Sequence, residues 1–336
     1  MGIDWIQSFN LWDTPISAWC RQISTDEYLS NLRNKYQTVF DNSSLGLCTK
    51  TKVHIKLLPD AKEVFIAKRP VPYTVRADIE TELDRLEKAN ILTPVNSSKF
   101  AASIVVSRKN GKIRICAGYS TGLNNSIEPN QYPLPTAEEI LADCHNCMIF
   151  THLDISDAYL QVEIDDQSKD LLTINTHKGL YKFNRLTPGI KSAPGAFQRI
   201  MDELCTGIQG ARAYIDDIVL ASTSLNDQKT NLNLLLQKIQ DYSFKLKFEK
   251  CQFFKPSIKY LGQIIDKDGI RPDPDKILAI QNIKVPENIS QVRSLLGSIN
   301  YYGKYVNNMR KIRKPLDDLL KKEHKVQRVS TVSRRM

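Results

Sequence analysis

The chain has 336 residues, of which 41% are hydrophobic and 25% charged. This is an ordinary globular composition, so it excludes a fibrous or wholly disordered protein. No apolar run approaches the roughly 18 to 20 residues that a membrane helix needs, so we expect no membrane span. Lys and Arg outnumber Asp and Glu by 47 to 37, a net charge of +10. A basic excess favours an anionic partner, usually nucleic acid.

The basic charge is concentrated at the C-terminal end. Residues 301–336 carry eleven Lys or Arg against three acidic residues, whereas the first 300 residues are nearly neutral. A basic end segment is also typical of a solvated tail, and composition alone favours that simpler interpretation.

Cysteine usage and the N-terminus indicate the compartment. Seven cysteines, an odd number in a chain too long to need disulfide bonds, are typical of a reducing, intracellular environment. Cys144 and Cys147 form one Cys-x-x-Cys pair, which lacks the second half of a zinc site. The first twenty residues have no basic start followed by an apolar run, so they do not form a secretory signal.

The first half of the chain predicts a helix and a hairpin. Ile79, Leu83 and Leu86 form one apolar stripe and predict a helix over 76–92. Two strand-forming runs flank an Asn-Gly pair at 110–111, which predicts a hairpin over 102–116 with a basic tip. Thr136 with Glu139 forms a capping box that opens a short helix.

The central region predicts several strands and one helix. An apolar run over 147–155 is typical of a buried strand, and 159–164 alternates as a strand whose Tyr159, Gln161 and Glu163 face outward or into a site. Further strands are predicted at 171–174 and 180–183. A turn is predicted at 188–189, and a helix at 193–206.

The remaining elements follow a second hairpin, predicted over 213–221 because two apolar runs are separated only by Asp216-Asp217. Asn226 is the predicted cap of a helix with an apolar face. Strands at 244–248 and 258–265 come next. Ser290 is the predicted cap of a later helix.

Three carboxylates in apolar surroundings are the candidate functional residues. An unpaired charge inside such runs costs several kcal/mol, so something must compensate for Asp154, Asp216 and Asp217. Alone, the Asp pair is typical of a turn, and Asp154 of a strand end satisfied by backbone N–H groups. Three acids on adjacent strands would instead repel one another unless divalent cations bind. Two Mg²⁺ about 4 Å apart support phosphoryl transfer by polymerases and nucleases.

Five ordered segments resemble those of reverse transcriptases, most closely the pol polyproteins of gypsy-type LTR retrotransposons. The resemblance runs from about residue 45 to residue 320. The segments that resemble the palm motifs are LDISDAYLQVEI (153–164), LTPGIKSAPGAFQRIMDEL (186–204) and AYIDDIVLAS (213–222). Those that resemble the fingers and the primer grip are KIRICAGYSTGLN (112–124) and EKCQFFKPSIKYLGQIID (249–266).

The resemblance implies an α+β right-hand polymerase fold with fingers, an antiparallel palm sheet and a thumb. It implies an RNA-directed DNA polymerase that extends a primer on an RNA or DNA template with dNTPs. Asp154, Asp216 and Asp217 would hold two Mg²⁺, for which Mn²⁺ can substitute. Tyr159 would be the steric gate that selects dNTPs, although a strand aromatic is the simpler interpretation.

Further residues receive roles by the same resemblance. Asp157 and Ala158 would offer backbone N–H groups to the triphosphate, and Lys250 would be the general acid to the pyrophosphate. Arg114, with Lys109 or Lys112, would hold phosphates from the fingers hairpin; alone, these would be a solvated basic turn. Gln198 would lie beneath the nascent base pair, or else simply be exposed. The primer grip would be formed by Tyr260, Leu261 and Gly262.

The resemblance also suggests boundaries. Residues 1–45 would be a linker that follows an absent aspartic protease, and 46–225 the fingers and palm. Residues 226–320 would complete the palm, primer grip and thumb. A basic tail would occupy 321–336, without the RNase H domain. We expect an intracellular protein, in the cytoplasm, a virus-like particle or the nucleus, and the sequence does not indicate an oligomeric state.

Three departures from the family pattern leave an alternative open. Pro188 stands where an aromatic ring usually lines the nucleotide pocket, Gly118 where Asp is usual, and Ser103 where Pro is common. They fit a catalytically inactive, nucleic-acid-binding remnant of the same fold. A second alternative is an interaction protein whose acids are merely structural.

Overall fold

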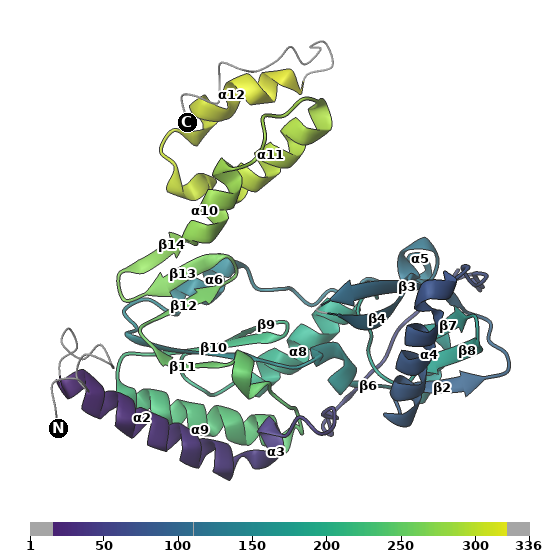
Figure 1. Ribbon diagram of the computed structural model, residues 1–336, viewed down its shortest axis with the longest axis horizontal. Helices are drawn as coiled ribbons and strands as arrows, with labels where there is room; N and C mark the ends of the chain where they lie inside the picture. The colour runs from purple at the N-terminus through teal and green to yellow at the C-terminus, as the bar shows by residue number, and fades with distance from the viewer. Residues whose placement is uncertain (1–15, 110, 321–336) are drawn as a thin grey trace.

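The computed structural model describes residues 16–109 and 111–320, and the basic tail lies outside them. A four-stranded sheet lies in the middle of the molecule, a five-stranded sheet lies to the right of it, and a group of C-terminal helices rises above it (Figure 1). One large core of buried side chains runs through the first two parts. The third part has a small core of its own around Val292, Leu296 and Leu316.

The five-stranded sheet contains the predicted hairpin. Helix α4 (Tyr73–Lys88) packs beside it with Ile79, Leu83 and Leu86 buried, as the stripe predicted. The helix ends before residue 92, because Asn90 has a positive φ of 54° and Leu92 already belongs to a strand. The strands, in spatial order, are β2 (Leu92–Val95), β8 (Gly179–Phe183), β7 (Thr173–Thr176), β3 (Ala102–Lys109) and β4 (Lys112–Ala117).

The central sheet is antiparallel throughout, which confirms the predicted palm-type sheet. Its outer strands, β9 (Ala211–Tyr214) and β11 (Gln252–Lys255), flank β10 (Asp217–Ser222) and β5 (Ile149–Asp154), which lie side by side. β5 pairs with β10 over six residues. In spatial order the strands are β11, β5, β10 and β9.

Three helices support this sheet (Figure 1). α8 (Ala193–Cys205) and α9 (Leu225–Asp241) bury their apolar faces in the main core. α2 (Ile16–Lys35) runs along α9, and the Tyr36 hydroxyl donates a hydrogen bond to the Asn233 carbonyl at 3.0 Å. Within the predicted linker over 1–45, residues 16–35 and 37–40 are helical, and Leu32 and Tyr36 belong to the core.

The C-terminal region starts with a three-stranded antiparallel sheet and ends in three helices (Figure 1). The predicted strand over 258–265 is two strands joined by a tight turn at 261–262. These elements are β12 (Ser257–Tyr260), β13 (Gln263–Asp266), β14 (Gly269–Pro272), α10 (Pro274–Gln281), α11 (Ile289–Tyr301) and α12 (Met309–Leu319).

One of the three predicted helix caps lies where the sequence placed it, and the other two lie nearby. The capping box is confirmed, because Thr136 N–H donates to Glu139 Oε2 and Glu139 N–H to Thr136 Oγ1. The two later caps fall two residues earlier than predicted, at Ser224 and Asn288, whose side chains accept backbone N–H groups. The helix opened by the capping box is α6 (Ala137–Ala142).

Two predicted strands are not regular strands. Residues 159–164 form a 3₁₀ turn, Ala158–Gln161, followed by the two-residue strand β6 (Glu163–Ile164). Of residues 244–248, only Leu246 pairs as in a sheet, through an isolated bridge with Ile155, and Phe248 begins a 3₁₀ turn. The other short elements are α3 (Gln37–Phe40), β1 (Lys52–Val53), α5 (Leu123–Ser126), α7 (Asp166–Lys169) and 3₁₀ turns at Tyr119–Thr121, Asp170–Leu172, Phe248–Lys250 and Gly303–Tyr305.

Within residues 16–109 and 111–320, no helix combines the length and the apolar character that crossing a membrane requires.

Candidate active site

The three acids meet at one edge of the central sheet. Asp154 is the last residue of β5 and lies directly opposite Asp217, the first residue of β10. Asp216 precedes Asp217, and its carbonyl accepts a hydrogen bond from Ile155 N–H at 3.0 Å. Two separate sequence positions, 154 and 216–217, are thus joined by backbone pairing.

The turn that presents Asp216 is strained and externally supported. Ile215 and Asp216 form the two-residue loop between β9 and β10, and Ile215 has a positive φ of 53°. That conformation is unfavourable for a β-branched residue, so its surroundings must hold it in place. Gln198 on α8 does so: its Oε1 accepts from Ile215 N–H at 2.8 Å and its Nε2 donates to the Ala213 carbonyl at 2.8 Å.

Electrostatics show that the acids affect one another. Burial raises the pKa of the Asp216 carboxyl above its ordinary value, and the negative charges of Asp217 and Asp154 raise it further. A cation bound between these groups would relieve that repulsion. The donor set is carboxylate oxygens only, which is the set that Mg²⁺ prefers.

Two side chains hold the flanking acids in this structure. Lys250 Nζ lies 3.0 Å from both carboxylate oxygens of Asp154, and His152 Nε2 lies 2.8 Å from Asp217 Oδ1. In the described part of the chain, no three or more His, Cys, Asp and Glu side chains are arranged as ready metal ligands. The carboxylates therefore fit Mg²⁺ chemically, but Asp154 and Asp217 must exchange these partners to bind it.

Tyr159 lies beside the acids. Its ring packs on Phe197 with the ring centroids 5.2 Å apart. Burial raises the pKa of the Tyr159 hydroxyl to about 12, and the nearby charge of Asp216 contributes. The position is compatible with the predicted steric gate, which stays a prediction.

The fingers hairpin reaches the loop that follows Asp154. Arg114 on β4 donates to Asp157 Oδ1 at 3.4 Å, and both side chains are about half exposed. Asp157 has a positive φ of 45° and precedes the 3₁₀ turn that begins at Ala158. Lys109 and Lys112 pair across the end of the hairpin through their backbones, and their side chains lie outside what the structure describes.

Two predicted contacts with ligands differ from the structure. Gln198 is fully buried and uses its amide on Ile215, Ala213 and Asp202, so it does not face a nucleotide. Tyr260 is 2% exposed and packs its ring against His152, so its side chain does not face a primer. Leu261 and Gly262, with φ of 47° and 73°, form the partly exposed turn between β12 and β13.

Comparison with known proteins decides the family. Residues 107–265 match the family model described as reverse transcriptase (RNA-dependent DNA polymerase). The chain contains a reverse transcriptase domain. The match covers both acidic segments, β12, and the hairpin from the end of β3 through β4.

Relatives of this reverse transcriptase domain are found in LTR retrotransposons, as the five segments predicted. An uncharacterized protein of Caenorhabditis elegans is 35% identical over 92% of this chain and 25% of its own length. The Pol polyprotein from transposon gypsy of Drosophila melanogaster is 29% identical over 87% of this chain and 29% of its own. The chain thus spans between a quarter and three tenths of these curated relatives.

Solved structures support the fold. A foamy viral protease-reverse transcriptase in complex with double-stranded DNA superimposes with a TM-score of 0.81 at 20% identity, over 88% of this chain and 52% of that one. The same viral protein with an RNA/DNA hybrid gives 0.79 at 19% identity, over 89% and 40%. The right-hand polymerase fold is confirmed, with the five-stranded sheet as fingers, the central sheet as palm and the C-terminal helices as thumb.

Two residues near the acids of the reverse transcriptase domain were missed. His152 could have been found, because it precedes Asp154 by two residues and so lies on the same face of the strand. Gln161 was predicted to face outward or into a site, yet it is fully buried. Its amide donates to the Ser156 and Lys245 carbonyls and accepts from Lys245 N–H. No sequence signal identifies those distant backbone partners.

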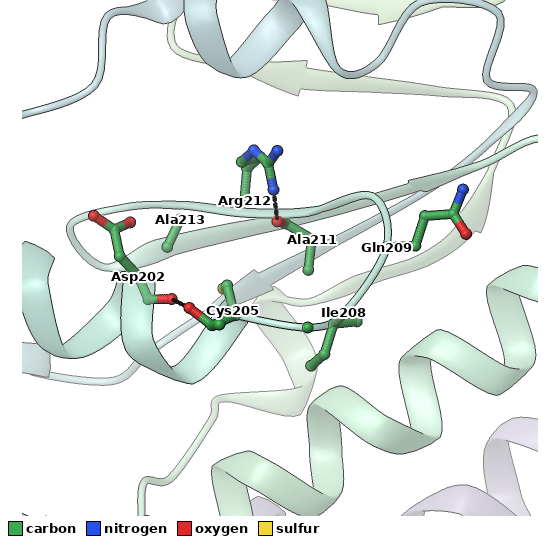
Figure 2. A pocket seen from close by; sticks show the side chains of 9 residues that line it. Asp202, Cys205, Ile208, Gln209, Ala211, Arg212 and Ala213 are labelled. Carbon is green, nitrogen blue, oxygen red and sulfur yellow. Dashed lines mark hydrogen bonds between the residues drawn. The ribbon is translucent and has the colours of Figure 1, made fainter.

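One hollow in the palm is lined by residues other than the three acids. It has a volume of about 520 Å³ and is lined by the end of α8 and the start of β9 (Figure 2). Arg212 borders it and pairs with Asp143. None of the three acids lines this hollow.

Proposed function

We propose that this chain is an RNA-directed DNA polymerase, which extends a primer 3′-hydroxyl with dNTPs on an RNA or DNA template. The observation that carries this proposal is the direct pairing of Asp154 with Asp217, next to the supported turn at Asp216. A structural turn does not need a second acid across the strand or a buried glutamine that holds a strained residue in place. The family of the domain agrees with that chemistry.

Two Mg²⁺ are the proposed cofactors, with Mn²⁺ as a substitute. Asp154, Asp216 and Asp217 would hold them. When bound, the ions would lower the pKa of the primer hydroxyl and neutralise charge on the phosphates. Because burial and neighbouring acids raise the pKa of Asp216, cation binding would also favour its charged form.

The chain's own residues would orient the substrates. Tyr159, held against Phe197, would lie under the sugar of the dNTP and exclude a 2′-hydroxyl. Arg114 would hold a phosphate after exchanging its 3.4 Å contact with Asp157. Lys250 would donate a proton to the departing pyrophosphate. Its ammonium lies 3.0 Å from Asp154, which places this proton donor beside the acids.

The template and primer would be held mainly through their phosphates. The foamy viral relatives were solved with double-stranded DNA and with an RNA/DNA hybrid, and we extend that partner class to this chain. The thumb helix α12 presents Arg310, Lys311, Arg313 and Lys314, although Arg313 is paired with Asp317. Binding through phosphates would be weakly sequence-specific and would weaken steeply with salt.

Primer extension on poly(rA)–oligo(dT) with Mg²⁺ tests this proposal. We expect salt-sensitive binding and incorporation of dTTP but not UTP. Binding without incorporation in either Mg²⁺ or Mn²⁺ would favour the inactive remnant. Absence of salt-dependent binding would favour the interaction protein.

A further inference from the structure

Three tyrosines of the thumb hold the turn between β12 and β13. The Tyr301 hydroxyl donates to the Leu261 carbonyl, and the Tyr302 hydroxyl donates to the Gly262 carbonyl at 3.3 Å. The Tyr305 hydroxyl donates to Gln263 Oε1 at 2.8 Å. Three hydroxyls therefore contact three consecutive residues, about 40 positions away in the sequence. We call Tyr301, Tyr302 and Tyr305 the tyrosine clasp.

The clasp fits a turn that needs external support. Leu261 and Gly262 both have positive φ, and for leucine that conformation is strained. A Cβ added at Gly262 would lie 3.5 Å from the Tyr302 hydroxyl, so the turn and the clasp are in close contact. The Tyr301 and Tyr302 rings also pack edge to face, with centroids 4.9 Å apart. The clasp thus combines one aromatic pair with three hydrogen bonds to a strained turn and the residue after it.

The turn is connected to the acids by continuous contacts. Tyr260 precedes Leu261, is almost fully buried, and packs its ring 5.9 Å from that of His152. His152 in turn lies 2.8 Å from Asp217 Oδ1. A displacement of the turn would therefore reach Asp217 through two packed rings.

A second contact anchors the same part of the thumb. Lys304, between two clasp tyrosines, forms an ion pair of 2.7 Å with Glu138 on α6, and its ammonium lies 5.3 Å from the centre of the Tyr305 ring. This surface pair is exposed, so we expect it to contribute little energy by itself. It orients the segment that carries the clasp.

We propose that Tyr301, Tyr302 and Tyr305 are positioning residues that couple the thumb to the turn at 261–263 and so fix the primer end relative to Asp217. This rests on the proposed function, because the turn matters only if a primer binds there. The clasp hydroxyls need not touch nucleic acid. They act by keeping the turn in one conformation while the thumb holds the duplex.

Tyrosine-to-phenylalanine variants test this, because they remove the hydroxyls and keep the rings. We expect fewer nucleotides to be added per binding event in Tyr301→Phe, in Tyr302→Phe and in the variant that changes all three clasp tyrosines to phenylalanine. An excess of unlabelled primer–template captures any protein that dissociates, so that each protein extends a labelled primer only once. Each lost hydrogen bond should reduce the number of added nucleotides by about two- to tenfold. The KM for dTTP should be unchanged. Tyr73→Phe, at an 88% exposed residue on α4, is the matched control.

A second measurement needs no catalysis. The probe is a DNA primer with 2-aminopurine at its 3′ end, annealed to an RNA template. Its fluorescence is measured when it is bound to the Asp216→Asn protein, which we expect not to extend it. The measurement is repeated with proteins that carry Asp216→Asn together with the clasp substitutions. We expect the clasp variants to change the fluorescence of the primer end by at least twofold. Equal fluorescence together with wild-type processivity would overturn the proposal. If the wild-type chain fails to extend any primer, the proposed function fails, while this fluorescence still tests the clasp. If the triple variant does not fold, Tyr301→Phe alone is used, because Tyr301 is about half exposed and we expect that single variant to fold.

Discussion

The Lys250 ammonium lies equally close, at 3.0 Å, to both carboxylate oxygens of Asp154. Lys250 ends a short 3₁₀ turn just before β11, and Asp154 ends β5, the strand with which β11 pairs. The central sheet therefore brings a lysine to an acid that lies 96 positions earlier in the chain. The contact gives the partly buried Asp154 carboxylate an opposite charge, which offsets part of the cost of burying it.

Lys250 should be needed for the proton transfer as well as for its charge. Lys250→Gln should lower single-turnover incorporation of dTTP by about 10²- to 10⁴-fold, the usual contribution of a general acid. Lys250→Arg keeps the ion pair with Asp154, but a guanidinium does not release its proton. This variant should therefore be nearly as slow as Lys250→Gln. A wild-type rate in Lys250→Arg would show that the charge alone matters.

Gln198 should stabilise the fold through the turn at Ile215. Gln198→Leu would leave the Ile215 N–H and the Ala213 carbonyl without their partner, at about 1–3 kcal/mol for each buried group. We expect the free energy of unfolding in urea to fall by about 2–5 kcal/mol, together with extension activity. Gln237→Leu, at an exposed position of α9, is the control and should change stability by less than about 0.5 kcal/mol.

Gly46 should tolerate no side chain. A Cβ there would overlap Gln161 Oε1 and lie 2.8 Å from the Ser243 carbonyl, and the buried Gln161 amide cannot move without losing its hydrogen bonds. Gly46→Ala should destabilise the protein by about 1–3 kcal/mol in urea unfolding. Gly297→Ala, in α11 with open space around it, should stabilise slightly because alanine favours helix. Equal effects would contradict the packing described for Gln161.

Asp41 should contribute a pH-dependent part of the stability. The Ser43 hydroxyl and N–H and the Lys245 ammonium donate to its carboxylate and lower the pKa of Asp41 from 3.8 to about 2. A lowered folded-state pKa stabilises above the ordinary value, and the contribution is lost as the pH falls through the folded-state pKa. The difference in Tm between wild type and Asp41→Asn should therefore be constant above about pH 5 and disappear toward pH 2. A difference that grows on acidification would contradict this.

Features with a local cause were predicted from the sequence. The hairpin around Gly111 depends on a two-residue turn, and the stripe of Ile79, Leu83 and Leu86 depends on helical periodicity. The acids at 154 and 216–217 stood out because charge within apolar runs needs compensation. The family resemblance then joined these segments into one fold.

Features that depend on distant partners were not predicted. Gln161 and Gln198 look like exposed polar residues, yet both are fully buried because backbone groups from other segments satisfy their amides. Tyr260 looked like a surface contact because nothing local shows that His152 packs on it. Burial of a polar side chain is decided by tertiary contacts, and a local pattern does not contain them.

Asp216→Asn tests the central claim most directly, because it removes one charge from the acids and preserves shape. Primer extension in Mg²⁺ would be compared for wild type, Asp216→Asn and Asp60→Asn, a control at an exposed position outside the helices and strands. We predict unchanged duplex binding for all three, and a Tm for Asp216→Asn that is equal to or above that of the wild type, because the substitution removes the repulsion from Asp154 and Asp217. Extension should fall at least about a hundredfold in Asp216→Asn only, the scale for removing one preorganised electrostatic group. Extension by Asp216→Asn at the wild-type rate would contradict the assignment of these acids as the polymerase centre.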